Sequence, residues 1–540
     1  MSKIKNSGDF FMGGRRFGKI LMIAQAFGVG THTDQPVTVS GAAYQSGLAG
    51  IWYQWIFMFS TPFFWIIAPV YRRLRYITMA DFFQERYGSG ISFLYTLIAL
   101  LYFCMNMGVM LKGTGVTVEG LTGGALSEEV VIIVSTILFI SYGLAGGIVA
   151  AVYTDLVQGI LILVLSFMLL PFAINMAGGM SVFHSELPEY MFSLVAPNEV
   201  TWFFIVMAVI NGLVMVVVLP HHMAIGGSGK TEISCRTGWT YGNFLKRFAT
   251  AGWAFIGVFA AFLFPELIGE HREMAFGIAA KELLPVGLVG LMLAAMIAAV
   301  MSTCDAFMVH ASALFTQNIY RPYVKPSATD RELLVVGRWA SLGIVAGGIM
   351  FAYSFPSVVH GIKEGWKITA YMGIAFWAGI MWKRANRWGT LASVVSMAFI
   401  GIYTQNQLDW GFAQQAALYL PVGFTAMIVV SAFTKMEPEN KLHAFYTLLD
   451  TPVGEEQRLR DAGIEIKLEG ASDANEATPN TQQSRVQHST QDRLIIVDLL
   501  SLPSKFSWKA YRTDILGFLA AAAIGALTIL AVYLLSRIGA

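Results

Sequence analysis

Long apolar stretches alternate with short polar segments along most of the chain. Many of these stretches are near the length of about 20 residues that crosses a lipid bilayer as an α-helix. Thirteen candidate spans can be counted, separated in most places by short loops. They cover residues 19–43, 50–71, 90–112, 129–149, 153–176, 201–222, 245–265, 285–315, 334–356, 360–382, 388–406, 417–434 and 512–536. The pattern predicts an all-α polytopic membrane protein.

The composition supports the same class. Of the 540 residues, 56% are hydrophobic and 13% are charged, whereas soluble domains carry about 25% charged residues. The three cysteines, Cys104, Cys235 and Cys304, are too far apart to suggest a disulfide framework or a metal site. The sequence also shows no nucleophile–base set. We therefore expect no enzyme, no cofactor beyond a coupling ion, and no nucleic-acid partner.

Lysine and arginine gather in alternate loops. They are frequent in residues 1–18 and in the loops that follow the second, sixth, eighth and tenth spans. Because short cytoplasmic loops are enriched in these residues, this side is predicted to face the cytoplasm. The N-terminus and the polar segment 435–511 are then predicted to lie on the cytoplasmic side of the plasma membrane. The last span, 512–536, ends outside it.

The polar segment 435–511 has three parts. Its "GEEQRLRDAG" is typical of a surface helix. The following "ASDANEATPNTQQSRVQHSTQDR" is polar and lacks aromatic residues, which predicts disorder. The closing "LIIVDLLSL" is apolar enough to lie along the membrane interface.

The first span contains a polar interruption. Gly28, Gly30 and Pro36 surround the run Thr31-His32-Thr33-Asp34-Gln35. Glycine weakens a helix and proline removes one of its hydrogen bonds. Unwound backbone at membrane depth occurs only where it is buried in protein or lines a cavity, and its free carbonyls can coordinate a cation. A packing kink is the simpler alternative, but the cost of placing a charged residue there favours a binding role.

The eighth span carries hydroxyl groups and a carboxylate. Ala299, Ser302 and Thr303 share one helix face and offer a carbonyl and two hydroxyl oxygens, which suit Na⁺. The alternative is that both hydroxyls bond back to their own helix. Asp305 follows in the same span, and Asp155 lies near the start of the fifth, where a helix cap is an alternative role.

Five motifs follow one another in order along about residues 8–320. They are "GDFFMGGRRFG", "SGAAYQSGLAGIWYQW", "TMADFFQERYG", "YGLAGGIVAAVYTDLVQ" and "GLVGLMLAAMIAAVMSTCDAFMVHASALFTQNIY". Together they resemble the sodium:solute symporter family, which includes sodium/sugar, sodium/proline and sodium/sialic acid symporters. The resemblance implies a secondary active transporter that couples Na⁺ entry to the uptake of a small polar solute.

The resemblance also implies an architecture. The transporter core would be residues 19–382, a five-plus-five inverted-repeat (LeuT-like) arrangement with repeats at about 19–176 and 201–382 and with the first span of each repeat broken. Residues 388–434 would add two accessory spans, between the core and the polar segment 435–511.

Sodium-binding residues follow from matching the family motifs. The resemblance implies that Gly28 and Thr31 contribute backbone ligands, Ala299 its carbonyl, and Ser302 and Thr303 their hydroxyls. This agrees with the inference drawn above from the residues alone.

A second cation site in some members uses an aspartate that matches Asp155, together with small hydroxyl residues. This chain has Asp305 and Ala306 at those hydroxyl positions. Asp305 is therefore a candidate cation ligand, a protonatable coupling group or the partner of a polar side chain.

Candidate solute ligands come from the sugar-transporting branch. Gln35, Gln54, Asn106 and Lys246 match its sugar-binding positions, and amide and ammonium groups suit a polyhydroxy ligand. His32 and Asp34 differ from the usual residues and join the candidate set. A sugar or sugar acid is favoured, with an amino acid or monocarboxylate as alternatives. Proton coupling through Asp34, His32 or Asp305 and, more remotely, a transporter-like membrane sensor also remain open.

Overall fold

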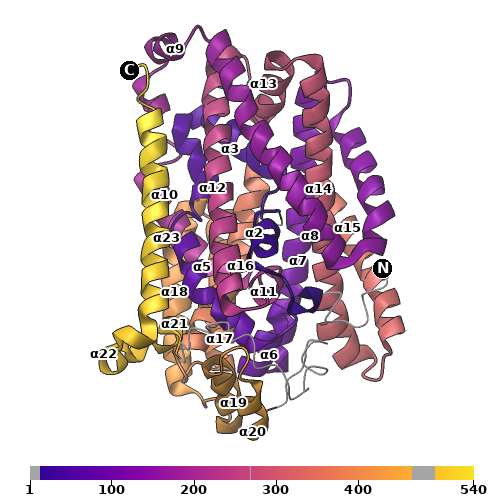
Figure 1. Ribbon diagram of the computed structural model, residues 1–540, viewed down its shortest axis with the longest axis vertical. Coiled ribbons are helices and arrows are strands. Elements are labelled where there is room, and N and C mark those ends of the chain that lie inside the picture. The colour runs from indigo at the N-terminus through magenta and orange to yellow at the C-terminus, as the bar shows by residue number, and fades with distance from the viewer. Residues whose placement is uncertain (1–11, 29, 268, 465–492) are drawn as a thin grey trace, which may run out of the picture.

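The computed structural model describes residues 12–28, 30–267, 269–464 and 493–540. Within these residues the regular structure is helical, apart from a single parallel bridge between Phe17 and Gly229. The helices form an elongated bundle whose long members run roughly along one common direction (Figure 1). This arrangement agrees with the predicted all-α class.

Six helices among the described residues are long and apolar enough to cross a membrane. Each of them coincides with a predicted span. They are α7 (Ser89–Thr122), α12 (Glu232–Leu263), α14 (Val286–Phe315) with its extension η6 (Thr316–Val324), α15 (Asp330–Ser354), α18 (Phe412–Phe433) and α23 (Trp508–Leu535). The predicted spans 360–382 and 388–406 are the less apolar helices α16 (Val358–Met381) and α17 (Arg387–Asn406).

The first span is broken, as predicted. It consists of α2 (Lys19–Gly28) and α3 (Asp34–Ser46), with the polar run between them. The sixth span is broken as well, into α10 (Trp202–Met215) with η4 (Val216–Val218) and the short α11 (His222–Gly227). Pro220 lies in this second break and supplies no backbone N–H to continue the helix.

The second span was predicted as one helix, and here the prediction was wrong. The chain forms η2 (Gly47–Ile51) and α4 (Trp52–Trp55), and then begins a new helix, α5 (Thr61–Leu74). The hydroxyls of Ser60 and Thr61 both donate to the carbonyl of Phe57, at 3.0 and 2.7 Å, and Pro62 occupies the first turn of α5. Pro62 has no backbone N–H to donate to the preceding turn, so the helical bonding is interrupted there and a new helix starts.

The fourth and fifth predicted spans, 129–149 and 153–176, both lie within one long helical element, α8 (Glu128–Met176). α8 begins at Glu128, beside the last turns of α7. The backbone N–H of Glu128 donates to the Glu119 carboxylate at 3.1 Å. Met176 leads into α9 (Met180–Glu186), which lies at the same end of the bundle as α13 (Ala275–Leu283) (Figure 1).

Both ends of α8 thus lie at one end of the bundle, since α13 packs against the end of α7. A straight helix of 49 residues would be about 74 Å long, so α8 must turn back on itself. The two predicted spans are its two arms.

The predicted polar segment and the C-terminus lie at opposite ends of the bundle. Figure 1 shows α19 (Glu439–Asp450) and α20 (Glu456–Asp461) beside α6 (Met79–Tyr87), and the C-terminus beside α9. Arg537 contacts Glu189 at 3.2 Å near that terminus. This agrees with opposite sides for the two segments, although which side is cytoplasmic remains a prediction from the charges.

Parts of the polar segment can be compared with expectation. The predicted surface helix is α20, whereas the predicted disordered run lies almost entirely outside the described residues. The closing "LIIVDLLSL" forms short helical turns in which Leu494 and Ile496 are buried and Leu499 and Leu500 are exposed. It therefore packs against the protein with one face.

Candidate transport site

A small cavity of about 80 Å³ lies at the break of the first span. Its walls come from the break itself and from α4, α7, α12 and α16, together with the break in the sixth span. The lining includes all six residues predicted to bind solute, namely His32, Asp34, Gln35, Gln54, Asn106 and Lys246. The structure therefore brings together residues that are separated by more than two hundred positions in the sequence.

The backbone of the break is held by local hydrogen bonds. The N–H of Thr31 donates to the carbonyl of Gly28 at 3.1 Å, and its hydroxyl donates to the carbonyl of Phe27 at 2.6 Å. The side-chain amide of Gln35 donates to the carbonyl of Gly30 at 2.9 Å. Val29 lies outside the described residues. These bonds fix the polar run without a helical ladder.

His32 and Asp34 form a pair at the cavity wall. His32 Nδ1 lies 3.5 Å from Asp34 Oδ1, too far for a well-formed hydrogen bond. Asp34 is buried, and its Oδ1 receives no hydrogen bond from the described residues. The cavity therefore contains an anionic acceptor that is only partly neutralised.

The predicted sodium ligands occupy two neighbouring segments. Thr303 donates its hydroxyl to the Ala299 carbonyl at 3.1 Å, which is the back-bonding that the sequence allowed as an alternative. This bond still leaves the lone pairs of the Thr303 oxygen available to a cation. One turn later the ring of Phe307 meets His32 edge-on, with ring centres 5.8 Å apart. This contact places α14 beside the break in the first span.

Ser302 is also buried in α14. Gly28 ends α2, and Thr31 lies in the break, so the five predicted ligands lie on two elements that approach each other near the His32–Phe307 contact.

The second predicted cation site is less complete. Asp305 is buried in α14, and its Oδ1 receives no hydrogen bond from the described part of the chain. It does not line the central cavity. Asp155 lies within α8, but its side chain is outside the described part. Whether these two carboxylates act together stays a prediction.

Several lining residues were not predicted. Arg247 follows Lys246 on α12, and both side chains are buried. The available signal was the pair of consecutive cations inside a predicted membrane span, where charged residues are costly. His221 and His222 line the cavity from the second break, with ring centres 4.6 Å apart. His222 Nδ1 lies 2.5 Å from the Val216 carbonyl and so has a structural partner.

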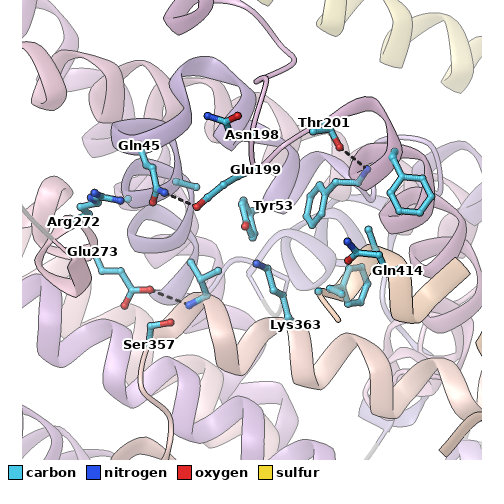
Figure 2. Close-up of a pocket in the computed structure, with 18 of the residues that line it drawn as sticks. Gln45, Tyr53, Asn198, Glu199, Thr201, Arg272, Glu273, Ser357, Lys363 and Gln414 are labelled. Carbon is cyan, nitrogen blue, oxygen red and sulfur yellow. Dashed lines mark hydrogen bonds between the residues drawn. The ribbon is translucent and has the colours of Figure 1, made fainter. Parts of the chain in front are cut away.

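A second, larger cavity of about 570 Å³ lies beyond the first (Figure 2). We call it the vestibule. Its polar lining is mostly bonded: Gln45 donates to Glu199 at 2.5 Å, and Glu273 accepts the backbone N–H groups of Val358 and Val359 at 2.9 and 3.0 Å. It contains residues from several connecting segments, including the one between α9 and α10, and so lies at the C-terminal end of the bundle.

A layer of aromatic rings separates the two cavities. Tyr53 lines the vestibule and Trp366 lines the central cavity, with ring centres 6.3 Å apart. The ring centres of Phe412 and Phe57 lie 5.5 and 6.4 Å from that of Trp366. The ammonium of Lys363 lies 5.3 Å from the centre of the Tyr53 ring. This layer is placed to act as a gate between vestibule and central cavity.

Comparison with known proteins identifies the family. The model of the sodium:solute symporter family matches residues 10–396. The chain belongs to the sodium:solute symporter family. It is a membrane transporter of the sodium-coupled symport class, as the motifs predicted.

Relatives within the sodium:solute symporter family transport different solutes. The chain is 24% identical to sodium/glucose cotransporter 1 of Oryctolagus cuniculus, over 87% of this chain and 81% of that protein. It is 26% identical to the osmoregulated proline transporter OpuE of Bacillus subtilis, over 83% of this chain and 92% of that protein. Relatives of such different kinds leave the solute of this member of the family undecided.

Solved structures show the same fold. A Na⁺-coupled sialic acid symporter, in a substrate-bound outward-open state, superposes with a TM-score of 0.68 at 18% identity, over 81% of this chain and 94% of that one. A nucleobase-cation-symport-1 family transporter gives a TM-score of 0.52 at 14% identity, over 82% of this chain and 99% of that one. The predicted five-plus-five inverted-repeat (LeuT-like) core is confirmed.

Proposed function

We propose that this symporter moves a sugar or sugar acid together with Na⁺ through the central cavity. The observation that carries the proposal is the gathering of His32, Asp34, Gln35, Gln54, Asn106 and Lys246 around one cavity at the break of the first span. Unpartnered amide oxygens and a buried ammonium at such a break suit a ligand with several hydroxyl groups.

In this proposal Na⁺ binds between α2 and α14. Gly28, Thr31 and Ala299 supply carbonyl oxygens, and Ser302 and Thr303 supply hydroxyls. The ion would hold the two segments together and favour the form in which solute enters from the vestibule. The membrane potential would contribute about 2.3 kcal/mol per charge per 100 mV to accumulation.

The orientation follows from the loop charges. The vestibule opens at the end of the bundle that carries the C-terminus, which the positive-inside rule places outside the cell. Solute then enters from the outside, passes the aromatic layer and leaves toward the side of α19 and α20. The protein would thus serve uptake across the plasma membrane.

The test is uptake by proteoliposomes that contain the purified chain, with an inward Na⁺ gradient and a panel of labelled sugars, sugar acids, amino acids and monocarboxylates. We expect Na⁺-dependent uptake of a sugar or sugar acid. Uptake confined to an amino acid or to a monocarboxylate without further hydroxyl groups would refute the assigned solute class.

Proton coupling is the second candidate, and it is favoured by the Oδ1 atoms of Asp34 and Asp305, which receive no hydrogen bond from the described residues. The same proteoliposomes separate the two. An inward pH gradient in the absence of Na⁺ drives uptake only if protons are the coupling ion.

A further inference from the structure

Two adjacent cations on α12 face the central cavity. Lys246 and Arg247 are 6% and 2% exposed, and both line the cavity. Among the described lining residues, Asp34 carries the one carboxylate. Leaving the histidines aside, the cavity wall therefore has two basic side chains and one acidic side chain.

Lys246 and Asp34 both line the cavity and attract each other electrostatically, but the Lys246 ammonium makes no hydrogen bond or close ion pair with the described residues. Asp34, the carboxylate of the cavity, instead has His32 as its near neighbour. An unpaired ammonium out of water is costly. The position of the Lys246 ammonium therefore favours a bound anion beside it.

Arg247 is held in place but not saturated. Its Nη1 donates to the backbone carbonyl of Gln54 at 3.1 Å, and its guanidinium lies 5.3 Å from the centre of the Phe57 ring. Its Nε donor is buried and has no partner among the described residues. A fixed guanidinium with a free donor is suited to bind a carboxylate.

The remaining wall offers acceptors. Gln35 and Gln54 each have a buried Oε1 that receives no hydrogen bond from the described residues. The amide of Gln35 is oriented by its bond to Gly30, which leaves that oxygen available. Side-chain carbonyl oxygens accept hydrogen bonds from hydroxyl groups. The part of the cavity near Lys246 and Arg247 is therefore suited to bind an anion. The part near Gln35 and Gln54 is suited to bind hydroxyl donors.

We propose that the solute is a hydroxylated carboxylate, a sugar acid rather than a neutral sugar, with its carboxylate against Lys246 and Arg247 and its hydroxyls against Gln35 and Gln54. This inference rests on the proposed function, because it assigns the solute of the same cavity. It makes Lys246 the residue that selects acid over neutral ligands.

Matched pairs of ligands test this assignment on the purified full-length chain. Thermal unfolding is followed with galacturonate against galactose, gluconate against sorbitol, and glucuronate against glucose, each in Na⁺ and in choline, at constant ionic strength. We expect the acid of at least one pair to raise the unfolding midpoint in Na⁺ and its neutral partner to have no effect. Equal or greater protection by the neutral partner, or no protection by any acid, would overturn the assignment.

The choline arm separates the two hypotheses. Protection by an acid that is equally strong without Na⁺ would refute sodium coupling at this site and would still support the anionic solute. Protection by a neutral sugar only in the presence of Na⁺ would support sodium coupling and would refute the anionic solute.

Substitution of the lysine provides the second readout. Lys246→Met should weaken binding of the protecting acid about tenfold or more, while the unfolding midpoint of the ligand-free protein stays the same or rises, because an unpaired buried charge is removed. Lys246→Arg should retain the preference for acids. Unchanged acid binding by Lys246→Met would overturn the proposal.

A matched control is available in α16. Lys367 is also buried, but its ammonium contacts Glu364 at 2.6 Å and donates to Gln405 at 2.8 Å. Lys367→Met should lower the unfolding midpoint without changing the preference for acids. The contrast distinguishes a ligand-binding lysine from a structural one.

Discussion

Arg73 and Glu232 form a two-pronged ion pair between α5 and α12. Arg73 Nε donates to one carboxylate oxygen at 2.9 Å, and Nη2 donates to the other at 3.1 Å. Arg73 also donates to the carbonyl of Leu449 at 3.0 Å, and Glu232 accepts the N–H of Val453 at 3.1 Å. The pair therefore ties two core helices to α19 and to the turn that follows it.

Breaking this pair should destabilise the protein. Glu232→Gln removes the carboxylate that pairs with Arg73, which is 1% exposed, and removing one partner of a buried pair costs about 3 kcal/mol. We expect a lower midpoint of thermal unfolding in detergent, partly restored in the double variant with Arg73→Met. Glu282→Gln, which removes an exposed ion pair with Lys281, is the control and should change the midpoint little.

The fold could be predicted from the sequence where a local signal exists. Gly28, Gly30 and Pro36 around a polar run marked the first break correctly. The hydroxyl bonds of Ser60 and Thr61 to Phe57 near the break between α4 and α5 give no sequence signal, because hydroxyl groups form such bonds equally well inside continuous helices. The reversal within α8 agrees with the two consecutive spans, 129–149 and 153–176, that the apolar pattern predicted.

The candidate site was predictable in part for the same reason. Motif matching placed Gln35, Gln54 and Lys246 together, and the cavity confirms that they are neighbours. Arg247 was missed because its role depends on contacts with Gln54 and Phe57, nearly two hundred residues away. The aromatic layer was not predicted for a similar reason, since Tyr53 and Trp366 meet only in three dimensions.

The proposed sodium site predicts a specific loss. Replacing both hydroxyls, in Ser302→Ala with Thr303→Val, should abolish Na⁺-dependent uptake, because two oxygen ligands are removed. Thr316→Val is the matched control, since its hydroxyl donates to the Ser312 carbonyl at 2.7 Å in the extension of the same helix, and it should keep the Na⁺ dependence. Uptake by the double variant with an unchanged Na⁺ requirement would show that the site is elsewhere.

The solute ligands should affect affinity more than stability. Gln54→Leu removes a buried, unpartnered acceptor, so the solute should bind about 5- to 100-fold more weakly, with little change in the unfolding midpoint. Gln25→Leu is the comparison, because Gln25 accepts a hydrogen bond from Ser228 at 2.9 Å. The Gln25→Leu variant should have a lower midpoint of thermal unfolding and an unchanged KM for uptake. If Gln54→Leu lowered the unfolding midpoint and left solute affinity unchanged, Gln54 would not be a solute ligand.

The aromatic layer should control access to the central cavity. Trp366→Ala removes the ring that packs between Phe57 and Phe412, and we expect Asn106→Cys to react faster with an impermeant thiol reagent added on the vestibule side. Trp388→Ala, on α17, removes a tryptophan that is 54% exposed and should leave the rate unchanged. Equal rates in the two backgrounds would mean that another element closes the cavity.

The reversal of α8 predicts the sidedness of three positions. Leu126 precedes α8 and Met176 ends it, both exposed, whereas Gln457 is exposed on α20 at the other end of the bundle. Cysteines introduced singly at these positions, in a background without Cys104, should react with an impermeant reagent on one face of the membrane for 126 and 176 and on the opposite face for 457. A straight α8 would instead place 126 and 176 on opposite faces. Because the loop charges predict that α20 is cytoplasmic, labelling of position 457 in intact cells would contradict the assigned orientation while leaving the reversal untouched.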